Sequence, residues 1–177
     1  MLITISGLPG SGTTTVSRLV AGALHLDRVP GGEVFRQLAA ESGMSLAEFG
    51  EHAQDHPEID RELDDRLEAR AREGSCVIES RLAGWLAVRA ELLAVRVWVD
   101  AEEGVRAARV AERDGTSAEE ARRDNAERAA LERGRYLAVY GIDLDDRAPY
   151  DVVLDSTFAS AKDLADEVID RARATFP

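Results

Sequence analysis

The stretch Gly7-Leu8-Pro9-Gly10-Ser11-Gly12-Thr13-Thr14-Thr15 decides the fold of this chain. It follows a run rich in β-branched residues that ends at Ser6, and it opens a pattern of apolar residues with helical spacing. Two glycines and a hydroxyl stand at the spacing G-x-x-x-x-G-K-[ST], which is typical of a phosphate-binding loop between a strand and a helix. Thr13 occupies the position of the expected lysine. The stretch therefore predicts a nucleotide site that must obtain part of its positive charge from elsewhere.

The glycines of this loop have a physical role, because a loop that wraps a polyphosphate must point successive backbone N–H groups inward. The N-terminus of the following helix adds further donors. The hydroxyl of Thr14 is suited to Mg²⁺, an ion that proteins hold through one or two oxygens beside waters and phosphates. The alternative is a tight glycine turn that caps a helix and binds nothing. The residues predicted to bind the polyphosphate are Gly7, Pro9, Gly10, Ser11, Gly12, Thr13, Thr14 and Thr15.

Composition limits the possible partners. The chain has 177 residues, which suits one domain with a real core, and its formal net charge is −12. An acidic surface repels nucleic acid and anionic lipid, so we expect neither as a partner, although a local arginine cluster can still bind an anion. Lys162 is the only lysine among 22 basic residues. The single cysteine, Cys76, excludes an internal disulfide and favours the cytoplasm, and no apolar run is long enough to span a membrane.

Apolar periodicity predicts strands that alternate with helices. We expect strands at 2–6, 27–30, 76–79, 95–99 and 151–154, and the intervening segments to be helical, including helices at 82–93 and from 117 to about 140. Such alternation favours an α/β fold of three layers, in which a parallel five-stranded sheet carries helices on both faces. Catalytic groups in such sheets gather at the carboxyl ends of the strands. Glu79 and Arg81 follow one such strand.

Four segments resemble one known family. The opening ISGLPGSGTTT, the segment GGEVFRQLAAESGMS, ESRLAGW after the third strand and the ERGRYLAVYGIDLDD stretch are similar to archaeal-type cytidylate kinases, which are P-loop nucleoside-monophosphate kinases. The resemblance runs from Met1 to about Phe158. It implies the P-loop kinase fold as a single domain over 1–177, with a monophosphate-binding segment at about 33–72 and a lid at about 114–135.

The resemblance also implies a reaction and residues for it. It implies ATP-dependent transfer of the γ-phosphoryl group to CMP or dCMP with Mg²⁺, in a cytoplasmic monomer whose partners are its nucleotides. Arg36 and Arg81 match positions that grip the acceptor phosphate, and Arg81, Arg128 and Arg135 are the expected catalytic residues. Guanidinium groups bind phosphate oxygens bidentately and stay charged, which suits phosphoryl transfer. Glu79 is expected to hold Mg²⁺ through water.

Alternatives remain at the level of the sequence. Most arginines on a charged chain solvate helix faces or pair with carboxylates, and for Arg109, Arg113 and Arg133 we expect such a role at least as readily as a phosphate contact. The scaffold also suits a kinase of another nucleotide or metabolite, or a pseudokinase in which Thr13 marks lost catalysis. The charge that replaces the lysine is expected from the lid, through Arg113, Arg128 or Arg135.

Overall fold

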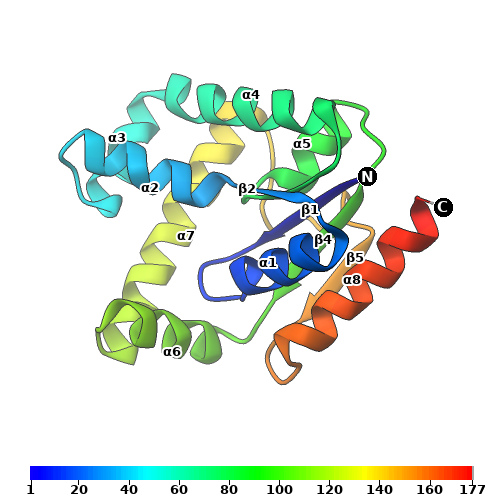
Figure 1. Ribbon diagram of the computed structural model, residues 1–177. Coiled ribbons are helices and arrows are strands. Elements are labelled where there is room, and N and C mark those ends of the chain that lie inside the picture. Colours follow the sequence, from blue (N-terminus) through cyan, green and yellow to red (C-terminus); the bar gives the residue numbers. More distant parts are fainter. Residues whose placement is uncertain (177) are drawn as a thin grey trace.

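The central sheet of the molecule is parallel throughout and has five strands. In the computed structural model, which describes residues 1–176, the strand order is β2-β3-β1-β4-β5. Figure 1 shows the sheet at the centre of the molecule, with helices on both sides. The α/β fold class predicted from the sequence is confirmed. The strands are β1 (Leu2–Gly7), β2 (Asp27–Pro30), β3 (Cys76–Glu79), β4 (Val95–Asp100) and β5 (Val152–Asp155).

Eight helices surround this sheet in the described residues. They are α1 (Thr13–Leu24), α2 (Gly31–Glu41), α3 (Leu46–Asp55), α4 (Pro57–Glu73), α5 (Ala83–Arg89), α6 (Glu103–Asp114), α7 (Ala118–Tyr140) and α8 (Ala161–Thr175). Helices α1 and α8 cover one face of the sheet, and α4 and α5 lie on the other (Figure 1). Helices α2 to α4 form one projecting group, and α6 with the start of α7 forms a second (Figure 1).

Two apolar clusters follow from the alternation of side chains along the strands. Ile3 and Ile5 face α1 and α8 on one side of the sheet, whereas Leu2 faces the cluster of α4 and α5 on the other. The strands of a parallel sheet are buried on both faces, and all six residues of β1 are buried accordingly. The sheet is thus a rigid support for the loops at its carboxyl edge.

Helix ends mostly agree with the local chemistry of the sequence. Ser45 and Glu48 form a capping box at the start of α3, and Pro57 occupies the first turn of α4. The helix predicted at 82–93 is shorter than expected, because α5 ends at Arg89. Glu91 there adopts a left-handed backbone with φ of 54°, and the N–H of Leu92 donates to the carbonyl of Ala87. No helix within residues 1–176 is both long and apolar enough to cross a membrane.

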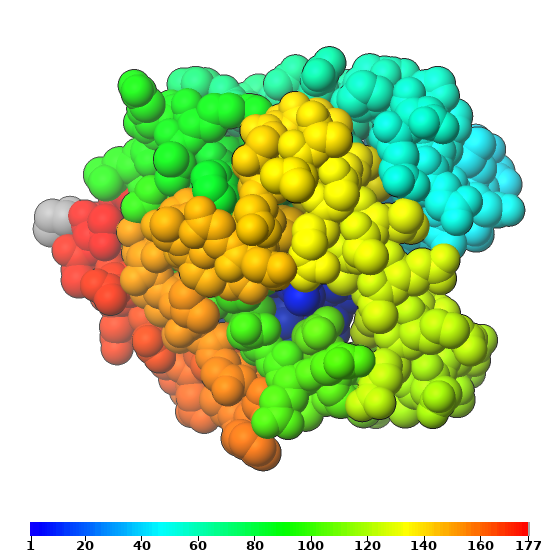
Figure 2. Space-filling view, turned by 180° about the vertical axis from the view of Figure 1, so that it is seen from behind, coloured from blue at the N-terminus to red at the C-terminus, as the bar shows by residue number. Residues whose placement is uncertain are grey.

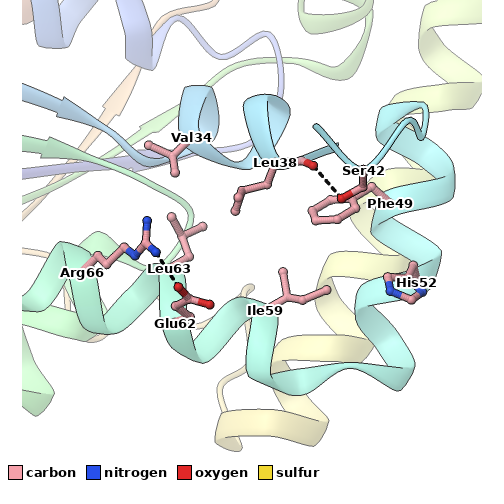
Figure 3. Close-up of a pocket in the computed structure, with 9 residues that line it drawn as sticks. All are labelled: Val34, Leu38, Ser42, Phe49, His52, Ile59, Glu62, Leu63 and Arg66. Carbon is pink, nitrogen blue, oxygen red and sulfur yellow. Dashed lines mark hydrogen bonds and ion pairs between the residues drawn. The ribbon is translucent and has the colours of Figure 1, made fainter. Parts of the chain in front are cut away.

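A cavity of about 210 Å³ lies between the helices of the first projecting group. Figure 3 shows side chains from α2, α3 and α4 around it, among them Leu38, Phe49 and Ile59. Its lining is mostly apolar, with Glu62 and Arg66 paired to each other at one side. A space of this kind offers little to a phosphate, so it is distinct from the site described next.

Candidate active site

The glycine loop after β1 has the backbone that its sequence predicts. Gly10 and Gly12 have φ of 82° and 93°, in the left-handed region that favours glycine. A Cβ on Gly7 would lie 2.5 Å from the Ser11 hydroxyl oxygen and 2.8 Å from a methyl carbon of Thr13. Gly10 and Gly12 are therefore required by their left-handed backbone, and Gly7 is required because a side chain there would collide with the loop.

The loop leaves its polar groups open at the N-terminus of α1. Gly12 is the N-cap of this helix and supplies no side chain to cap it. The Ser11 hydroxyl is buried and has no hydrogen-bond partner in the described part of the chain. Open helix N–H groups and an unpartnered donor in a glycine loop are what a bound phosphate would satisfy.

The carboxylate of Glu79, at the carboxyl end of β3, accepts hydrogen bonds from three hydroxyls at the end of the loop and the start of α1. Its Oε1 accepts from the hydroxyls of Thr13 at 3.1 Å and Thr14 at 2.6 Å, and its Oε2 accepts from the Ser17 hydroxyl at 2.9 Å. Arg28 of β2 donates to Oε2 at 2.6 Å and pairs with Glu33 on its other side. Thr13 thus points at a carboxylate, and its neighbouring cation is an arginine from the edge strand.

The donor set at Glu79 fits Mg²⁺. A hydroxyl and a carboxylate oxygen lie 2.6 Å apart at the mouth of the loop, and hard oxygen ligands in this number suit an ion that keeps waters and substrate phosphates. No three His, Cys, Asp or Glu side chains among residues 1–176 converge into an all-protein metal site. Thr14 of the loop and Glu79 at the end of β3 are the residues that could hold the ion.

Arg81 joins the loop to α7. Its Nη1 donates to the carbonyl of Gly7 at 2.7 Å, and its Nε donates to Oε2 of Glu132 at 2.7 Å. The other oxygen of Glu132 accepts from Nε of Arg128 at 2.7 Å. Burial alone would raise the pKa of Glu132, but Arg81 and Arg128 lower it to about 2. This carboxylate is therefore ionised and holds two of the predicted arginines.

Arg36, Arg113 and Arg128 come together from α2, α6 and α7. Partial desolvation and the charges of Arg128 and Arg113 lower the pKa of the Arg36 guanidinium. Arg113 pairs with the adjacent Asp114 at 2.6 Å, whereas no ion pair is recorded for Arg36 within residues 1–176. Arg36 thus lies near two other guanidinium groups with no ion pair of its own among the described residues, an arrangement that is suited to binding an anion.

Arg135, the third predicted catalytic arginine, is buried. Its side chain is 3% exposed and forms an ion pair with Asp60 at 2.5 Å, and its Nη1 donates to the carbonyl of Gly50 at 3.0 Å. Its guanidinium also packs over the rings of Phe35 and Tyr136. The structure thus places Arg135 in a buried ion pair enclosed by α2, α3 and α4 and does not bring it together with Arg81 and Arg128 at Glu132.

Sequence reasoning missed residues that hold the loop from outside it. Arg109 of α6, expected to be solvated or paired, donates to the Gly10 carbonyl at 3.3 Å and to the Ser156 hydroxyl at 2.8 Å. Ser156 in turn donates to the Ser11 carbonyl at 2.7 Å. Ser156 could have been found from the sequence, because it directly follows the last strand. Arg28 and Glu132 have no such signal, and only the tertiary structure brings them to the site.

The surface of the molecule is hollowed over its N-terminal segment. Figure 2 shows atoms of the blue N-terminal segment at the bottom of a depression, which is bordered by the green region around α6 and the yellow-green α7. A glycine loop after the first strand, together with arginines of α2, α6 and α7 that lie near one another, is typical of a P-loop kinase, which binds donor and acceptor in one cleft.

Comparisons with known proteins agree with the class of P-loop kinases and identify one family within it. A family model described as an AAA domain matches residues 3–130. A cytidylate kinase from Pyrococcus horikoshii is 50% identical over 157 residues, which cover 89% of this chain and 80% of the relative. A cytidylate kinase from Methanopyrus kandleri is 42% identical over 185 residues, which cover 97% and 96%. The chain belongs to the cytidylate kinase family.

Solved structures share the fold at low sequence identity. Shikimate kinase from Acinetobacter baumannii superposes with a TM-score of 0.61 at 13% identity and covers 99% of this chain and 94% of its own. A gluconokinase from Sinorhizobium meliloti gives 0.63 at 17% identity, covering 98% and 92%. At such identities the likeness extends to the fold alone.

Proposed function

We propose that this protein transfers the γ-phosphoryl group of ATP to CMP or dCMP, giving ADP and the corresponding diphosphate. The observation that carries the proposal is the position of Arg36 near Arg113 and Arg128 and near Glu79, whose carboxylate accepts from Thr14 of the phosphate loop. Phosphoryl transfer needs two anionic substrates held in line, and it needs their charge neutralised. Membership of the cytidylate kinase family supports the choice of acceptor.

The donor site is the glycine loop. The N–H groups of the loop, apart from those of Ser11 and Thr15 that already donate to carbonyls, would bind the β- and γ-phosphates of ATP, with Pro9 shaping the turn. Thr14 and Glu79 would hold Mg²⁺, which supplies neutralisation of phosphate charge when it is bound. Glu79 already accepts four donors, from Thr13, Thr14, Ser17 and Arg28, so we expect its contacts to rearrange when the ion binds.

The acceptor site lies toward α2 and α7. Arg36 and Arg81 would hold the phosphate of the monophosphate, and Arg128 would lie at the phosphoryl group in transfer. An oxygen of the acceptor phosphate attacks the γ-phosphorus, the bond from that phosphorus to the β–γ bridging oxygen breaks, and ADP leaves with the electron pair. Closure of the α6–α7 group, the proposed lid at about 114–135, over the segment at about 33–72 would exclude water from this step.

Thr13 requires that another cation carry the charge of the usual lysine. Arg81 and Arg109 are already bonded to loop carbonyls, and Arg28 lies across Glu79 from Thr13. We infer that several fixed arginines share this role, with Arg128 added from the proposed lid. We also place the activity in the cytoplasm, where a lone buried thiol such as Cys76 stays reduced.

An acceptor panel tests the proposed reaction. Phosphoryl transfer from ATP with Mg²⁺ is measured on CMP, dCMP, UMP, AMP and GMP, and CMP or dCMP is expected to dominate. Arg36→Ala should raise the KM for the best acceptor about 10- to 100-fold, the loss expected for charge-assisted bonds to phosphate. Arg173→Ala, which removes an exposed arginine at the far end of α8, is the control and should leave the kinetics unchanged.

Two outcomes would overturn the proposal. A dominant acceptor outside the pyrimidine nucleotides would indicate a different kinase on the same scaffold. Binding of ATP in calorimetry with no ADP formed for any acceptor would indicate a pseudokinase.

A further inference from the structure

We propose that Glu132 is a positioning residue that sets the orientation of Arg81 and Arg128 toward the two substrates, an inference that rests on the proposed function. Glu132 lies in α7 with its side chain 6% exposed, and each of its carboxylate oxygens accepts from one arginine at 2.7 Å. One of these arginines follows β3 and the other is in α7. A single carboxylate thus fixes two guanidinium groups that come from different elements.

The atoms used in these bonds decide which way the guanidinium groups face. Both arginines donate to Glu132 through Nε, the nitrogen nearest the backbone. A guanidinium carries five N–H donors in a rigid plane, so anchoring it at Nε leaves the terminal fork to point away from the carboxylate. No hydrogen-bond partner is recorded for either terminal nitrogen of Arg128 within residues 1–176. That fork is the geometry that binds phosphate oxygens in pairs.

Arg81 extends this arrangement to the phosphate loop. Its Nη1 donates to the Gly7 carbonyl, so the chain of contacts runs from Arg128 through Glu132 and Arg81 to the first residue of the loop. Arg36 lies close enough to Arg128 and Arg113 for their charges to lower the pKa of its guanidinium. The acceptor arginine and the arginine of α7 therefore have a fixed spacing relative to the donor loop before any substrate binds.

Helix stability does not account for this pair. In a helix, an acidic residue four positions before a basic one stabilises more than the reverse order, and Arg128 precedes Glu132. Burial of a carboxylate also opposes folding unless its partners are held close. The two arginines keep Glu132 ionised far below neutral pH. A buried charge with two paired cations beside the loop is better explained by pre-organisation of the site.

Substitution of Glu132 tests the role. Glu132→Gln keeps the size of the side chain but presents an amide N–H to one guanidinium, so that this arginine is no longer held in place. The kcat should fall about 100-fold, the loss expected when a group at the reacting phosphate is displaced by about 1 Å. The KM for CMP should rise several-fold through Arg81, and the KM for ATP should stay within about threefold. Glu132→Asp keeps the charge and should recover part of the lost kcat. Asp151→Asn is the matched control, because Asp151 pairs with Arg96 through Nε and Nη2 at the opposite edge of the sheet.

Coupling between the residues separates positioning from a purely structural role. Glu132→Gln combined with Arg128→Ala should lower kcat by clearly less than the product of the two single losses, because the part of the Glu132 effect that acts through Arg128 is already lost, while the rise in the KM for CMP through Arg81 should remain. If Glu132→Gln does not fold, Arg128→Lys is measured in its place. Lysine keeps the charge, but its single ammonium group cannot bond Glu132 and also offer two parallel N–H donors to a phosphate, as the arginine can. The kcat of Arg128→Lys should then be nearly as low as that of Arg128→Ala.

Several results would overturn the inference. Full kcat in Glu132→Gln, additive losses in the double variant, or full kcat in Arg128→Lys would each show that Glu132 does not position these arginines. Wild-type protein that phosphorylates neither CMP nor dCMP would overturn the proposed function instead, and this measurement is made before any variant.

Discussion

Thr13 shows how a single side chain changes the electrostatics of a loop. Its hydroxyl donates to Glu79, and Arg28 donates to the same carboxylate. A lysine at this position would place a mobile ammonium beside the phosphates, whereas the threonine leaves the nearby charge to arginines fixed by several bonds each. The positive charge of the site is thereby distributed over separate elements instead of residing in the loop.

Asp64 is a carboxylate whose surroundings disfavour its ionised form. It lies on α4 with 5% of its surface exposed, beside Tyr140 and near Asp60 and Arg89. Burial, together with the nearby Asp60, raises the pKa of its carboxyl from 3.8 to about 6. Because the folded state binds this proton more tightly than the unfolded chain, the contribution of Asp64 lowers stability as pH rises from about 4 to 6.

We expect Asp64→Asn to stabilise the protein in a pH-dependent manner. The gain in the free energy of unfolding should be absent near pH 4 and reach about 2–3 kcal/mol above pH 7, since each pKa unit corresponds to about 1.4 kcal/mol. Urea unfolding at several pH values measures it. The exposed neighbour Asp65 provides the control variant, Asp65→Asn, for which no such trend is expected. A gain that does not change with pH would contradict the prediction.

At the scale of elements, α7 connects the two helical groups around the site. Glu132 connects α7 to the phosphate loop through Arg81, while Arg135 reaches Asp60 of α4 and the Gly50 carbonyl of α3. The side chains of Arg135 and Asp60 are both 3% exposed, so their charges are compensated mainly by each other. The pair holds the proposed acceptor segment against α7.

Arg135→Met should therefore act on stability more than on chemistry. Removing the guanidinium leaves Asp60 buried without its counter-charge, which costs about 3–5 kcal/mol of unfolding free energy. The double variant with Asp60→Asn should recover much of this loss. Arg133→Met removes an exposed pair with Asp145 and should cost less than about 1 kcal/mol. Urea unfolding of the three variants measures these losses in stability. An Arg135→Met protein that is as stable as the wild type but has lost kcat would contradict the prediction and support a direct catalytic role.

At the scale of the whole molecule, charge is distributed unevenly. The net charge is −12, yet arginines gather at the phosphate loop and the facing helices. Such a surface repels a second copy of the chain while the cleft still attracts a nucleotide. Large exposed apolar side chains lie on separate elements, with Leu93, Leu137 and Phe158 among the most exposed.

We therefore expect a monomer in solution. Sedimentation equilibrium should give a mass near 19.2 kDa that does not change with protein concentration. Addition of about 0.5 M NaCl screens the repulsion between copies and should not produce a dimer. A mass that doubles at micromolar concentration would contradict this and indicate an interface between copies.

The sequence by itself determined the sheet, the glycine loop and the candidates Thr14, Glu79, Arg36 and Arg81, because strand periodicity and loop chemistry are local properties. It also identified the arginines near α7, but not which way each faces. That orientation depends on partners distant in the chain, since Glu132 binds Arg81 across 51 positions and Arg135 meets Asp60 of another helix. The tertiary structure alone decided that Arg128 shares Glu132 with Arg81 while Arg135 is buried against Asp60, because a buried cation lies where a carboxylate compensates it.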